Sequence, residues 1–218
     1  MKKFVLILNT DILLDAGLFA REYEKADSAR RKKTDRFRFG KDKRLSLGAD
    51  ILLRKGLERL GVTEFTFGYG ENGKPFLLGC KDVFFNISHS GVYAVCAFSD
   101  KPVGVDIEKK HDFEDELIRY VYLQSEIDHI MRSSSDKNAA FTDLWTIKES
   151  LMKYLGTGIS LEPKSICVSL DESITAQAEG FDCISLRFTQ FHAPAGYSLT
   201  VCSEYEEFAK SAETVCIE

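Results

Sequence analysis

Apolar and polar positions recur along the chain with two different periods, which predict both strands and helices. A nearly continuous apolar run over residues 3–8 predicts a buried first strand. Apolar residues three and four positions apart predict amphipathic helices over residues 12–25, 41–60 and 137–155. Asp27 or Ser28 is a suitable N-cap for a short basic helix after the first of these. One strand followed by helices therefore opens the chain.

The middle of the chain is rich in β-branched and aromatic residues between turn signals, which is typical of strands. The strands expected there cover residues 65–67, 83–88, 92–98 and 103–107. Helical spacing returns over residues 113–132, with a break near 123–125. Further strands are expected at 165–170, 183–189 and 198–203, with a short helical tail after Glu204. The order β-α-α-β-β-β occurs twice, so we expect an α+β fold of two halves that meet near residue 104.

Composition narrows the class of protein. The 218 residues are 44% hydrophobic and 29% charged, which excludes wholesale disorder. The net charge of −5 disfavours a general nucleic-acid binder. The six cysteines are scattered without a C-x-x-C pair, which favours free thiols in a reducing compartment over a disulfide frame or a zinc site. No apolar run approaches the ~20 residues that span a bilayer, so we expect a cytoplasmic protein without membrane association.

The segment 103–108 carries the sharpest local pattern. Because strand side chains alternate, Asp106 and Glu108 share the face opposite to an apolar one. Two carboxylates this close raise each other's pKa unless a cation lies between them, and Mg²⁺ is the simplest such ion. A half-buried edge strand with a solvated acidic face is the alternative, which the spacing alone favours.

The helix expected at 137–155 carries a polar ridge beside its apolar stripe. Thr142, Thr146, Glu149 and Lys153 lie along this ridge. Glu149 and Lys153 are one turn apart, and such a pair is often only an exposed ion pair. If the ridge faces the acidic strand, Glu149 is a third carboxylate for the metal ion and Lys153 is a cation beside a bound phosphate.

Basic residues suggest a site for a polyanion. Residues 30–44 hold nine Lys and Arg against two Asp, which fits a solvated face, a nucleic-acid patch or a pocket for a phosphorylated small molecule. Lys74 lies on a tight turn that lacks the Walker A pattern. Ser88 and His89 end a predicted strand, where they can contact a phosphate, although these residues alone favour a lone turn histidine without such a role.

Four segments in this order resemble the 4′-phosphopantetheinyl transferases of the surfactin-synthetase-activating type. These segments are 73–75 (GKP), 85–90 (FNISHS), 104–108 (GVDIE) and 145–153 (WTIKESLMK). The resemblance covers about residues 30–160 and implies two similar α+β halves with coenzyme A in the cleft between them. Residues 1–103 are then the coenzyme A-binding half, and residues 104–218 carry most of the metal ligands and catalytic residues.

The resemblance also implies a reaction. The 4′-phosphopantetheine arm of coenzyme A is transferred to a serine hydroxyl of an apo acyl or peptidyl carrier protein, and adenosine 3′,5′-bisphosphate is released. Asp106, Glu108 and Glu149 are expected to hold Mg²⁺. Lys153 and His89 are expected to contact the pyrophosphate, and Glu149 to accept the serine proton directly or through water.

Further contacts to coenzyme A follow from the same resemblance. Lys74 and Ser88 are expected near the pyrophosphate, and Arg30, Lys33 and Arg44 are expected to neutralise the 3′-phosphate. The partners are then coenzyme A and a carrier protein, with no nucleic acid and no membrane, and the protein is expected to be a monomer.

Two other functions use the same residues. A Mg²⁺-dependent phosphohydrolase needs the carboxylates but no carrier protein. An RNA-binding module uses the basic stretch 30–44 and leaves the carboxylates solvated.

Overall fold

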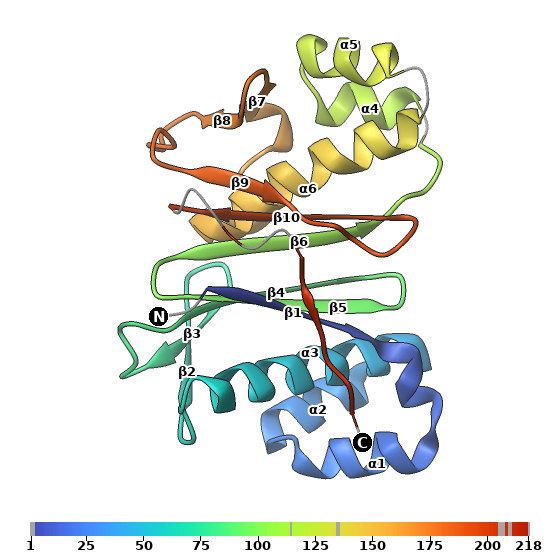
Figure 1. The fold of residues 1–218 in the computed structure, drawn as a ribbon, viewed down its shortest axis with the longest axis vertical. Helices are drawn as coiled ribbons and strands as arrows, with labels where there is room; N and C mark the ends of the chain where they lie inside the picture. The colour runs from blue at the N-terminus through green and yellow to red at the C-terminus, as the bar shows by residue number, and fades with distance from the viewer. Residues whose placement is uncertain (1–2, 114, 134–135, 205–207, 209–210, 218) are drawn as a thin grey trace.

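The computed structural model describes residues 3–113, 115–133, 136–204, 208 and 211–217. Figure 1 shows two stacked halves, each with strands toward the centre of the molecule and helices on the outside. The N-terminal half holds β1 (Phe4–Asn9), a 3₁₀ turn (Thr10–Leu14), α1 (Ala16–Lys25), α2 (Ser28–Arg36), α3 (Gly40–Arg59), β2 (Thr66–Tyr69), β3 (Pro75–Leu78), β4 (Phe84–Ser90) and β5 (Tyr93–Ser99).

The C-terminal half follows the same order of elements. It holds β6 (Val103–Lys109), α4 (Asp115–Val121), α5 (Gln124–Arg132), α6 (Lys137–Leu155), two 3₁₀ turns (Gly158–Ser160 and Pro163–Ser165), β7 (Ile166–Leu170), β8 (Ile174–Ala178), β9 (Arg187–Gln190), β10 (Tyr197–Ser203) and β11 (Glu213–Thr214). Within the described residues, each half has one strand, three α-helices and then four strands, with β11 as an addition. The expected α+β fold of two similar halves is confirmed, with one more strand per half, β3 and β8, than expected.

Several predicted elements differ from the structure. The helix expected over 12–25 begins as a 3₁₀ turn, because Asp15 has an extended backbone and its side chain caps α1. β3 and β8 are short and were not expected, and the strand expected from 183 begins at Arg187. The helical tail expected after Glu204 is wrong for the described residues 211–217, which contain no helix, and residues 205–207, 209–210 and 218 lie outside the described part. Glu213 and Thr214 form β11, which pairs in parallel with β1.

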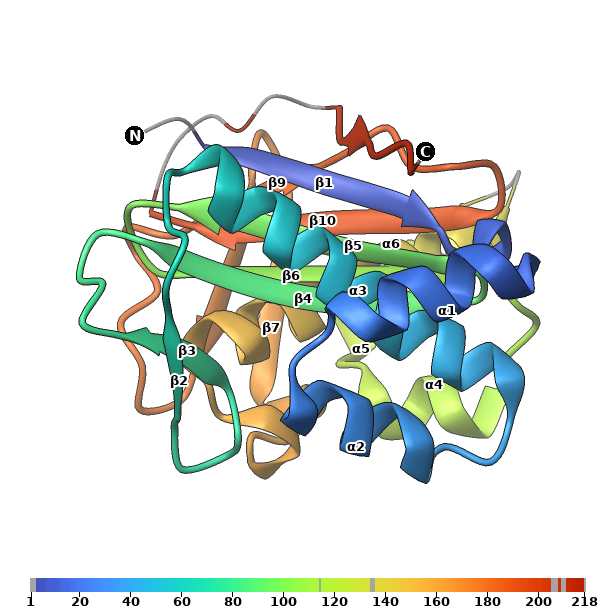
Figure 2. The ribbon, with the colours of Figure 1, turned by 90° about the horizontal axis from the view of Figure 1, so that it is seen from below.

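Three apolar layers hold these elements together. Strands β11-β1-β5-β4 form one sheet, and β6-β10-β9 form a second. α3 covers the outer face of the first sheet and α6 lies on the outer face of the second, as Figures 1 and 2 show. Between the sheets lies an apolar layer to which β6 contributes Val103, Val105 and Ile107. The opposite face of β6, with Asp106 and Glu108, is therefore directed toward α6, as the alternation predicts.

α6 packs against β6 with almost no space between the two backbones. A Cβ atom at Gly104 would lie 2.0 Å from the carbonyl oxygen of Ser150 and 2.5 Å from the amide nitrogen of Tyr154. Both atoms belong to the backbone of α6, so a flexible side chain cannot move aside to make room. Glycine at position 104 is therefore what allows α6 to approach β6 this closely.

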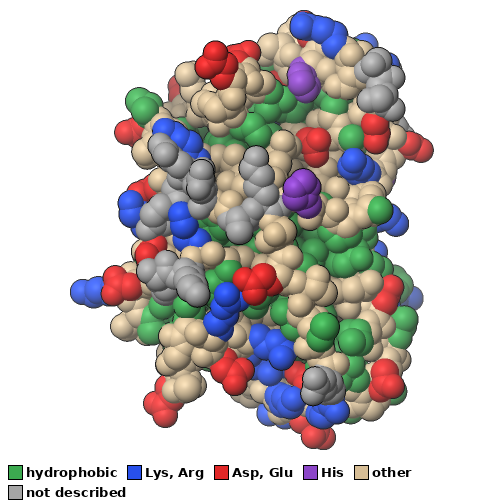
Figure 3. Space-filling model, viewed as in Figure 1, with side chains coloured by type: hydrophobic (Ala, Val, Ile, Leu, Met, Phe, Trp, Pro, Cys, Tyr) green, Lys and Arg blue, Asp and Glu red, His purple; other side chains and the backbone are tan. Residues whose placement is uncertain are grey.

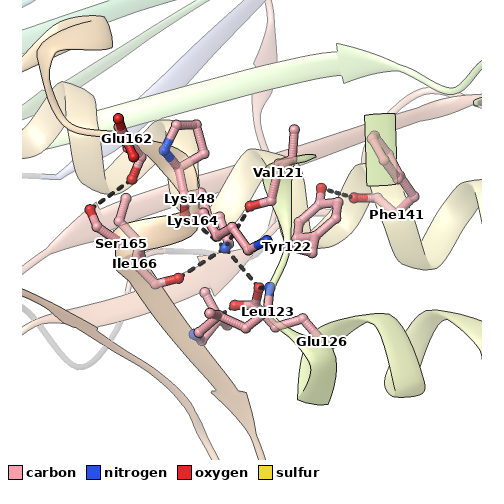
Figure 4. Close-up of polar contacts among 12 residues, drawn as sticks. Val121, Tyr122, Leu123, Glu126, Phe141, Lys148, Glu162, Lys164, Ser165 and Ile166 are labelled. Atoms are coloured by element: carbon pink, nitrogen blue, oxygen red, sulfur yellow. Dashed lines mark hydrogen bonds and ion pairs between the residues drawn. The ribbon is translucent and has the colours of Figure 1, made fainter. Parts of the chain in front are cut away.

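On its other side, α6 is fastened by a buried lysine (Figure 4). Lys148 has no exposed surface, and its Nζ lies 2.7 Å from Oε2 of Glu126, which is also buried. The same ammonium donates to the main-chain carbonyls of Val121, Pro163 and Ile166. Glu126 in turn accepts the amide of Val168. This cluster joins α6 to α5 and to the start of β7, and it fixes the rotation of α6 about its axis.

Replacing Gly104 tests the close packing of α6. We expect Gly104→Ala to lower the free energy of unfolding by about 1–3 kcal/mol or more, because the added methyl group overlaps backbone atoms. Gly40→Ala is the control, since a Cβ there meets only the end of the Arg44 side chain at 3.4 Å. Urea denaturation measures both variants. Equal stability of the two would contradict the packing argument.

Replacing Lys148 tests the buried ion pair. Lys148→Met leaves the Glu126 carboxylate buried without its cation, and we expect a loss of about 3–5 kcal/mol in the free energy of unfolding. The double variant Lys148→Met/Glu126→Gln removes the stranded charge and should recover part of that loss. Denaturation at neutral pH compares the two, and a double variant less stable than the single one would be inconsistent with this account.

Candidate active site

The two halves meet along a polar seam between β4 and β6, the edge strands of the two sheets. Asn86, Ser88 and Ser90 lie at alternate positions of β4, so they share the face that points to β6. Asn86 Oδ1 accepts the amide of Val105 at 2.8 Å. The hydroxyls of Ser88 and Ser90 donate to carboxylates of β6, each at 2.7 Å. Serines of the N-terminal half thus orient the carboxylates of the C-terminal half.

Asp106 lies at the centre of this seam and receives the ammonium of Lys153. The Lys153 Nζ is 2.6 Å from Asp106 Oδ1 and 2.8 Å from Ser88 Oγ. Asp106 is only 2% exposed, and its second oxygen, Oδ2, is buried without a hydrogen-bond partner. Because buried polar atoms are normally satisfied, Oδ2 is an open position for a cation. The polar ridge of α6 therefore faces β6, which is the arrangement that a role for Glu149 and Lys153 beside Asp106 requires.

Glu108 and Glu149 complete an acidic group around Asp106. Burial raises the pKa of Glu149, and the negative charges of Asp106 and Glu108 raise it further. Burial also raises the pKa of Glu108, with a further contribution from Asp106. Three carboxylates from β6 and α6 therefore repel one another across this face, and Lys153 alone offsets the charge only in part.

The donor set suits a hard divalent cation, although the side chains are not gathered around one. As placed, no three His, Cys, Asp or Glu side chains of the described residues are close enough together to hold a metal ion. Oxygen donors, mutual repulsion and the unpartnered Asp106 Oδ2 are the properties that Mg²⁺ relieves. The residues present therefore fit this ion by their chemistry.

Positive groups gather on the side of the seam that belongs to the N-terminal half. Loss of hydration around the His89 ring lowers the pKa of this residue. The positive charges of Lys153 and then Lys33 lower it further. Burial and the charge of Arg30 lower the pKa of Lys33. These side chains raise one another's electrostatic free energy, so an anion placed among them is favoured.

Arg30 and Lys33 line a cavity of about 130 Å³ beside this positive group. The other residues that line the cavity are Asp27, Ala29, Leu53, Phe67, Tyr69, Gly73, Pro75 and Ile87. The cavity thus joins the basic helix α2 to the β2–β3 hairpin, which lie far apart in the sequence. Aromatic rings and cations around one hollow suit a phosphorylated planar ligand.

A chain of alternating charges holds Arg30 in position. Arg30 Nε lies 3.4 Å from Asp50 Oδ1, and Arg54 bridges Asp50 at 2.8 Å and Glu22 at 3.0 Å. Lys25 contacts the same Glu22 at 2.6 Å. Asp50 and Glu22 are both buried, so this network is screened from solvent. It anchors the basic side of the site to α1 and α3.

Two predicted contacts lie differently from expectation. The ammonium of Lys74 donates to the main-chain carbonyls of Val103, Lys153 and Tyr154, so its side chain is not directed at a phosphate. Arg44 lies near the start of α3, with Nη2 3.9 Å from Asp11 and a buried Nε without a partner. The Arg44 guanidinium therefore keeps a donor for a ligand, whereas the Lys74 ammonium is already occupied.

An apolar pocket of about 220 Å³ lies on the other side of Glu108. It is lined by Glu108, His111, Phe113, Leu117, Val121, Phe141, Thr142 and Trp145. Trp145 begins the segment 145–153 that carries the family resemblance, and in the structure it lines this pocket. Glu108 thus lies between a hydrophobic recess and the positive group of the other half.

Sequence reasoning overlooked three kinds of residue in this region. Asn86 and Ser90 bind β6, and their alternation with Ser88 in β4 is a signal that could have indicated it. Asp50 and Arg54 are four apart on α3, which predicts a pair but not its link to Arg30. Trp145 carried no signal that separates a pocket from a core position.

Charge is mixed on the face of the molecule drawn in Figure 3. Lysine and arginine side chains there are interspersed with aspartate and glutamate side chains. An extended nucleic acid requires a continuous basic band, and the residues drawn in colour on that face do not form one. No helix in the described parts of the chain is long and apolar enough to cross a membrane.

Comparison with known proteins assigns the family. The family model "4'-phosphopantetheinyl transferase, N-terminal" matches residues 19–101, and the model "4'-phosphopantetheinyl transferase superfamily" matches residues 102–202. The 4'-phosphopantetheinyl transferase Sfp of Bacillus subtilis (strain 168) is 31% identical over 216 residues, which are 95% of this chain and 96% of that protein. A 4'-phosphopantetheinyl transferase of Bacillus subtilis is 32% identical over 208 residues, 92% of each chain.

One solved structure, the holo-[acyl-carrier-protein] synthase (AcpS) of Thermotoga maritima, aligns with 46% of this chain and 61% of that chain. Its TM-score of 0.38 and 12% identity are too low to carry a conclusion. The sequence relatives are sufficient: the chain belongs to the 4′-phosphopantetheinyl transferase superfamily. Within it, the chain is an enzyme of the Sfp type, which transfers 4′-phosphopantetheine from coenzyme A to carrier proteins.

The charge network beneath Arg30 predicts a pH dependence of stability. Burial alone raises the pKa of Glu22, but hydrogen bonds from Lys25 and Arg54 outweigh it and hold the pKa below its usual 4.5. A lowered pKa means that the carboxylate stabilises the fold above pH 4.5, and that this stabilisation is lost as the pH falls through the folded-state pKa. We expect Glu22→Gln to be less stable than the wild type at pH 7.

The difference in free energy of unfolding between wild type and Glu22→Gln should shrink as the pH is lowered below 4.5. Urea denaturation at several pH values measures it. Glu24→Gln is the matched control, because Glu24 is an exposed residue of the same helix. A difference that stays constant with pH would contradict the role of the Glu22 charge.

Proposed function

We propose that the enzyme transfers the 4′-phosphopantetheine arm to a serine hydroxyl of an apo acyl or peptidyl carrier protein in a Mg²⁺-dependent reaction, with release of adenosine 3′,5′-bisphosphate. One observation carries the proposal: α6 brings Glu149 and Lys153 to the carboxylates of β6, next to a positive group from the other half. Adjacent regions of opposite charge suit a metal–pyrophosphate complex.

Asp106, Glu108 and Glu149 are the proposed metal-binding residues. When bound, Mg²⁺ supplies Lewis-acid stabilisation of charge on the phosphate oxygens. The unpartnered Asp106 Oδ2 and the raised pKa values of Glu108 and Glu149 support this assignment, since both indicate that a cation is favoured. Ser88 and Ser90 hold two of the carboxylates in place.

Lys153 and His89 are the proposed contacts to the pyrophosphate, with Ser88 beside them. Phosphoryl transfer depends mainly on charge neutralisation and in-line positioning. Lys153 already lies 2.8 Å from Ser88 Oγ, so it can serve an anion at the seam with a small change of side-chain position. Desolvation and the neighbouring cations lower the pKa of His89, and a bound anion would favour its protonated form.

Glu149 is the proposed general base. It is half-buried on α6, on the ridge that faces Asp106 and Glu108, where a carboxylate oxygen can act as a proton acceptor. We propose that it accepts the proton of the carrier serine directly or through a water molecule. Glu149, Lys153 and His89 are thus the residues that act on the reacting groups.

The two cavities suggest where the two ends of coenzyme A lie. The basic cavity with Arg30 and Lys33 is proposed for the nucleotide and its 3′-phosphate, with Arg44 as a third cation. The apolar pocket beside Glu108 is proposed for the pantetheine arm, because the arm leaves the pyrophosphate on the side away from the nucleotide. Lys74 belongs to the hairpin that lines the nucleotide cavity, although its ammonium is engaged elsewhere.

The remaining assignments are proposals of the same kind. Residues 1–103 are proposed as the half that binds coenzyme A, and residues 104–218 as the half that carries most catalytic groups. A cytoplasmic location is supported by six free cysteines, of which Cys96, Cys183 and Cys202 are buried. We propose that the enzyme works as a monomer on carrier proteins, without nucleic acid or membrane partners.

The test is direct transfer to a carrier. The enzyme is incubated with Mg²⁺, coenzyme A and a panel of apo acyl and peptidyl carrier proteins, and the carriers are weighed by mass spectrometry. A gain of one phosphopantetheine group on serine supports the proposal. Release of inorganic phosphate without a modified carrier favours a phosphohydrolase, and salt-dependent RNA binding without affinity for coenzyme A favours an RNA-binding module.

Glu149→Gln tests the proposed base. We expect turnover to fall by about 10²- to 10⁴-fold, because general-base catalysis contributes that range. The variant should remain folded and at least as stable as the wild type without metal, since it removes repulsion with Asp106 and Glu108. Glu58→Gln, an exposed glutamate on α3, is the control and should keep full activity. Wild-type turnover in Glu149→Gln would remove Glu149 from the mechanism.

A further inference from the structure

The tip of the β2–β3 hairpin reaches across to the C-terminal end of α6. A tight turn forms this tip: the amide of Gly70 donates to the carbonyl of Lys74, and the amide of Gly73 donates to that of Gly70. Asn72 Nδ2 then donates to the carbonyl of Gly156 at 3.0 Å, just beyond the helix. A loop of the N-terminal half is therefore docked on the helix that carries the catalytic residues.

Lys74 makes the main contact of this docking. Its Nζ lies 2.6 Å from the carbonyl oxygen of Lys153, 3.1 Å from that of Tyr154 and 3.2 Å from that of Val103. A lysine ammonium has three protons, so its hydrogen-bonding capacity is fully used by these three acceptors. A phosphate could be bound only by giving up one of them, which argues against a direct contact between Lys74 and the pyrophosphate.

The carbonyls that Lys74 binds are ones that α6 cannot satisfy itself. The last four carbonyls of a helix have no partner within it. In α6, the carbonyl of Met152 accepts the amides of Gly156 and Thr157, which leaves those of Lys153, Tyr154 and Leu155. Lys74 satisfies the first two of these three, and its positive charge also favours the negative end of the helix dipole. It is a C-terminal cap supplied by the other half of the molecule.

We propose that Lys74 is a positioning residue that fixes the last turn of α6 and thereby holds Lys153 at Asp106 and Ser88. The proposal rests on the proposed role of Lys153 in the transfer reaction. Gly73 and Pro75, on either side of Lys74, line the cavity that also holds Arg30 and Lys33. The hairpin thus ties the nucleotide side of the site to the position of a catalytic lysine.

A double-mutant cycle tests whether Lys74 acts through Lys153. We expect Lys74→Met to lower kcat by about 10- to 100-fold, the scale expected for a misplaced catalytic group. In the Lys153→Met background, the same change should lower kcat by less than about twofold, because the group that it positions is already gone. Lys81→Met, an exposed lysine in the loop that follows β3, is the control.

Two results would overturn the proposal. A direct phosphate contact by Lys74, or a general loss of folding, lowers kcat by the same factor in both backgrounds, so the effects multiply. If Lys74→Met is unfolded by circular dichroism, Lys74→Gln, which keeps two donors, replaces it in the cycle with the same expectation. If the wild type modifies no carrier, the proposed function fails rather than the role of Lys74.

Hydrogen exchange tests the capping contact without any activity. In Lys74→Met, the amides at the end of α6, including Gly156 and Thr157, should exchange faster than in the wild type. Amides in the first turns of α6 should be unchanged, and Lys81→Met should behave as the wild type throughout. Unchanged exchange at the end of α6 would show that Lys74 does not fix this turn.

Discussion

The direct contact between α6 and β6 is the constraint on which the rest of the structure depends. The absence of a side chain at Gly104 lets the backbone of Ser150 and Tyr154 lie against the strand. At this separation the polar ridge of α6 meets the acidic face of β6, and Lys153 reaches Asp106 at 2.6 Å. The buried Lys148 cluster and the Lys74 cap hold the same helix from two other directions. One helix is thus fixed by β6, by the Lys148 cluster and by a cap at its end, and it presents its charged groups to the seam on the side that contacts β6.

The seam between the halves places unfavourable charges side by side. Burial and the charge of Asp106 raise the pKa of Glu108 and of Glu149, whereas burial and the charges of Lys153 and Lys33 lower the pKa of His89. Under the proposed function, a metal ion would offset the first effect and a pyrophosphate the second. The buried networks around Glu22 and Lys148 provide stability away from the site. Proteins commonly accept unfavourable electrostatic interactions at a functional site and are stabilised by interactions elsewhere.

Local periodicity predicted the parts of the site that lie within one element. The alternation in β6 placed Asp106 and Glu108 on one face, and helical spacing placed Glu149 and Lys153 on one ridge. It could not predict that Lys74 caps α6, because that contact joins residues 79 positions apart through the packing of two halves. Lys148 lies within the predicted helix 137–155, and only the fold shows that Glu126 and three carbonyls surround it. The strands β3 and β8 escaped prediction, although their partners in the two-stranded sheets, β2 and β7, were predicted.

The most direct measurement of the central claim is the location of the metal ion. A crystal of the enzyme with coenzyme A and Mn²⁺ in place of Mg²⁺ gives an anomalous signal at the ion. The account predicts a peak coordinated by carboxylate oxygens of Asp106, Glu108 and Glu149 and by oxygens of the pyrophosphate. A peak bound by other residues, or a fully bound coenzyme A with the Glu149 carboxylate directed away from the ion, would contradict it.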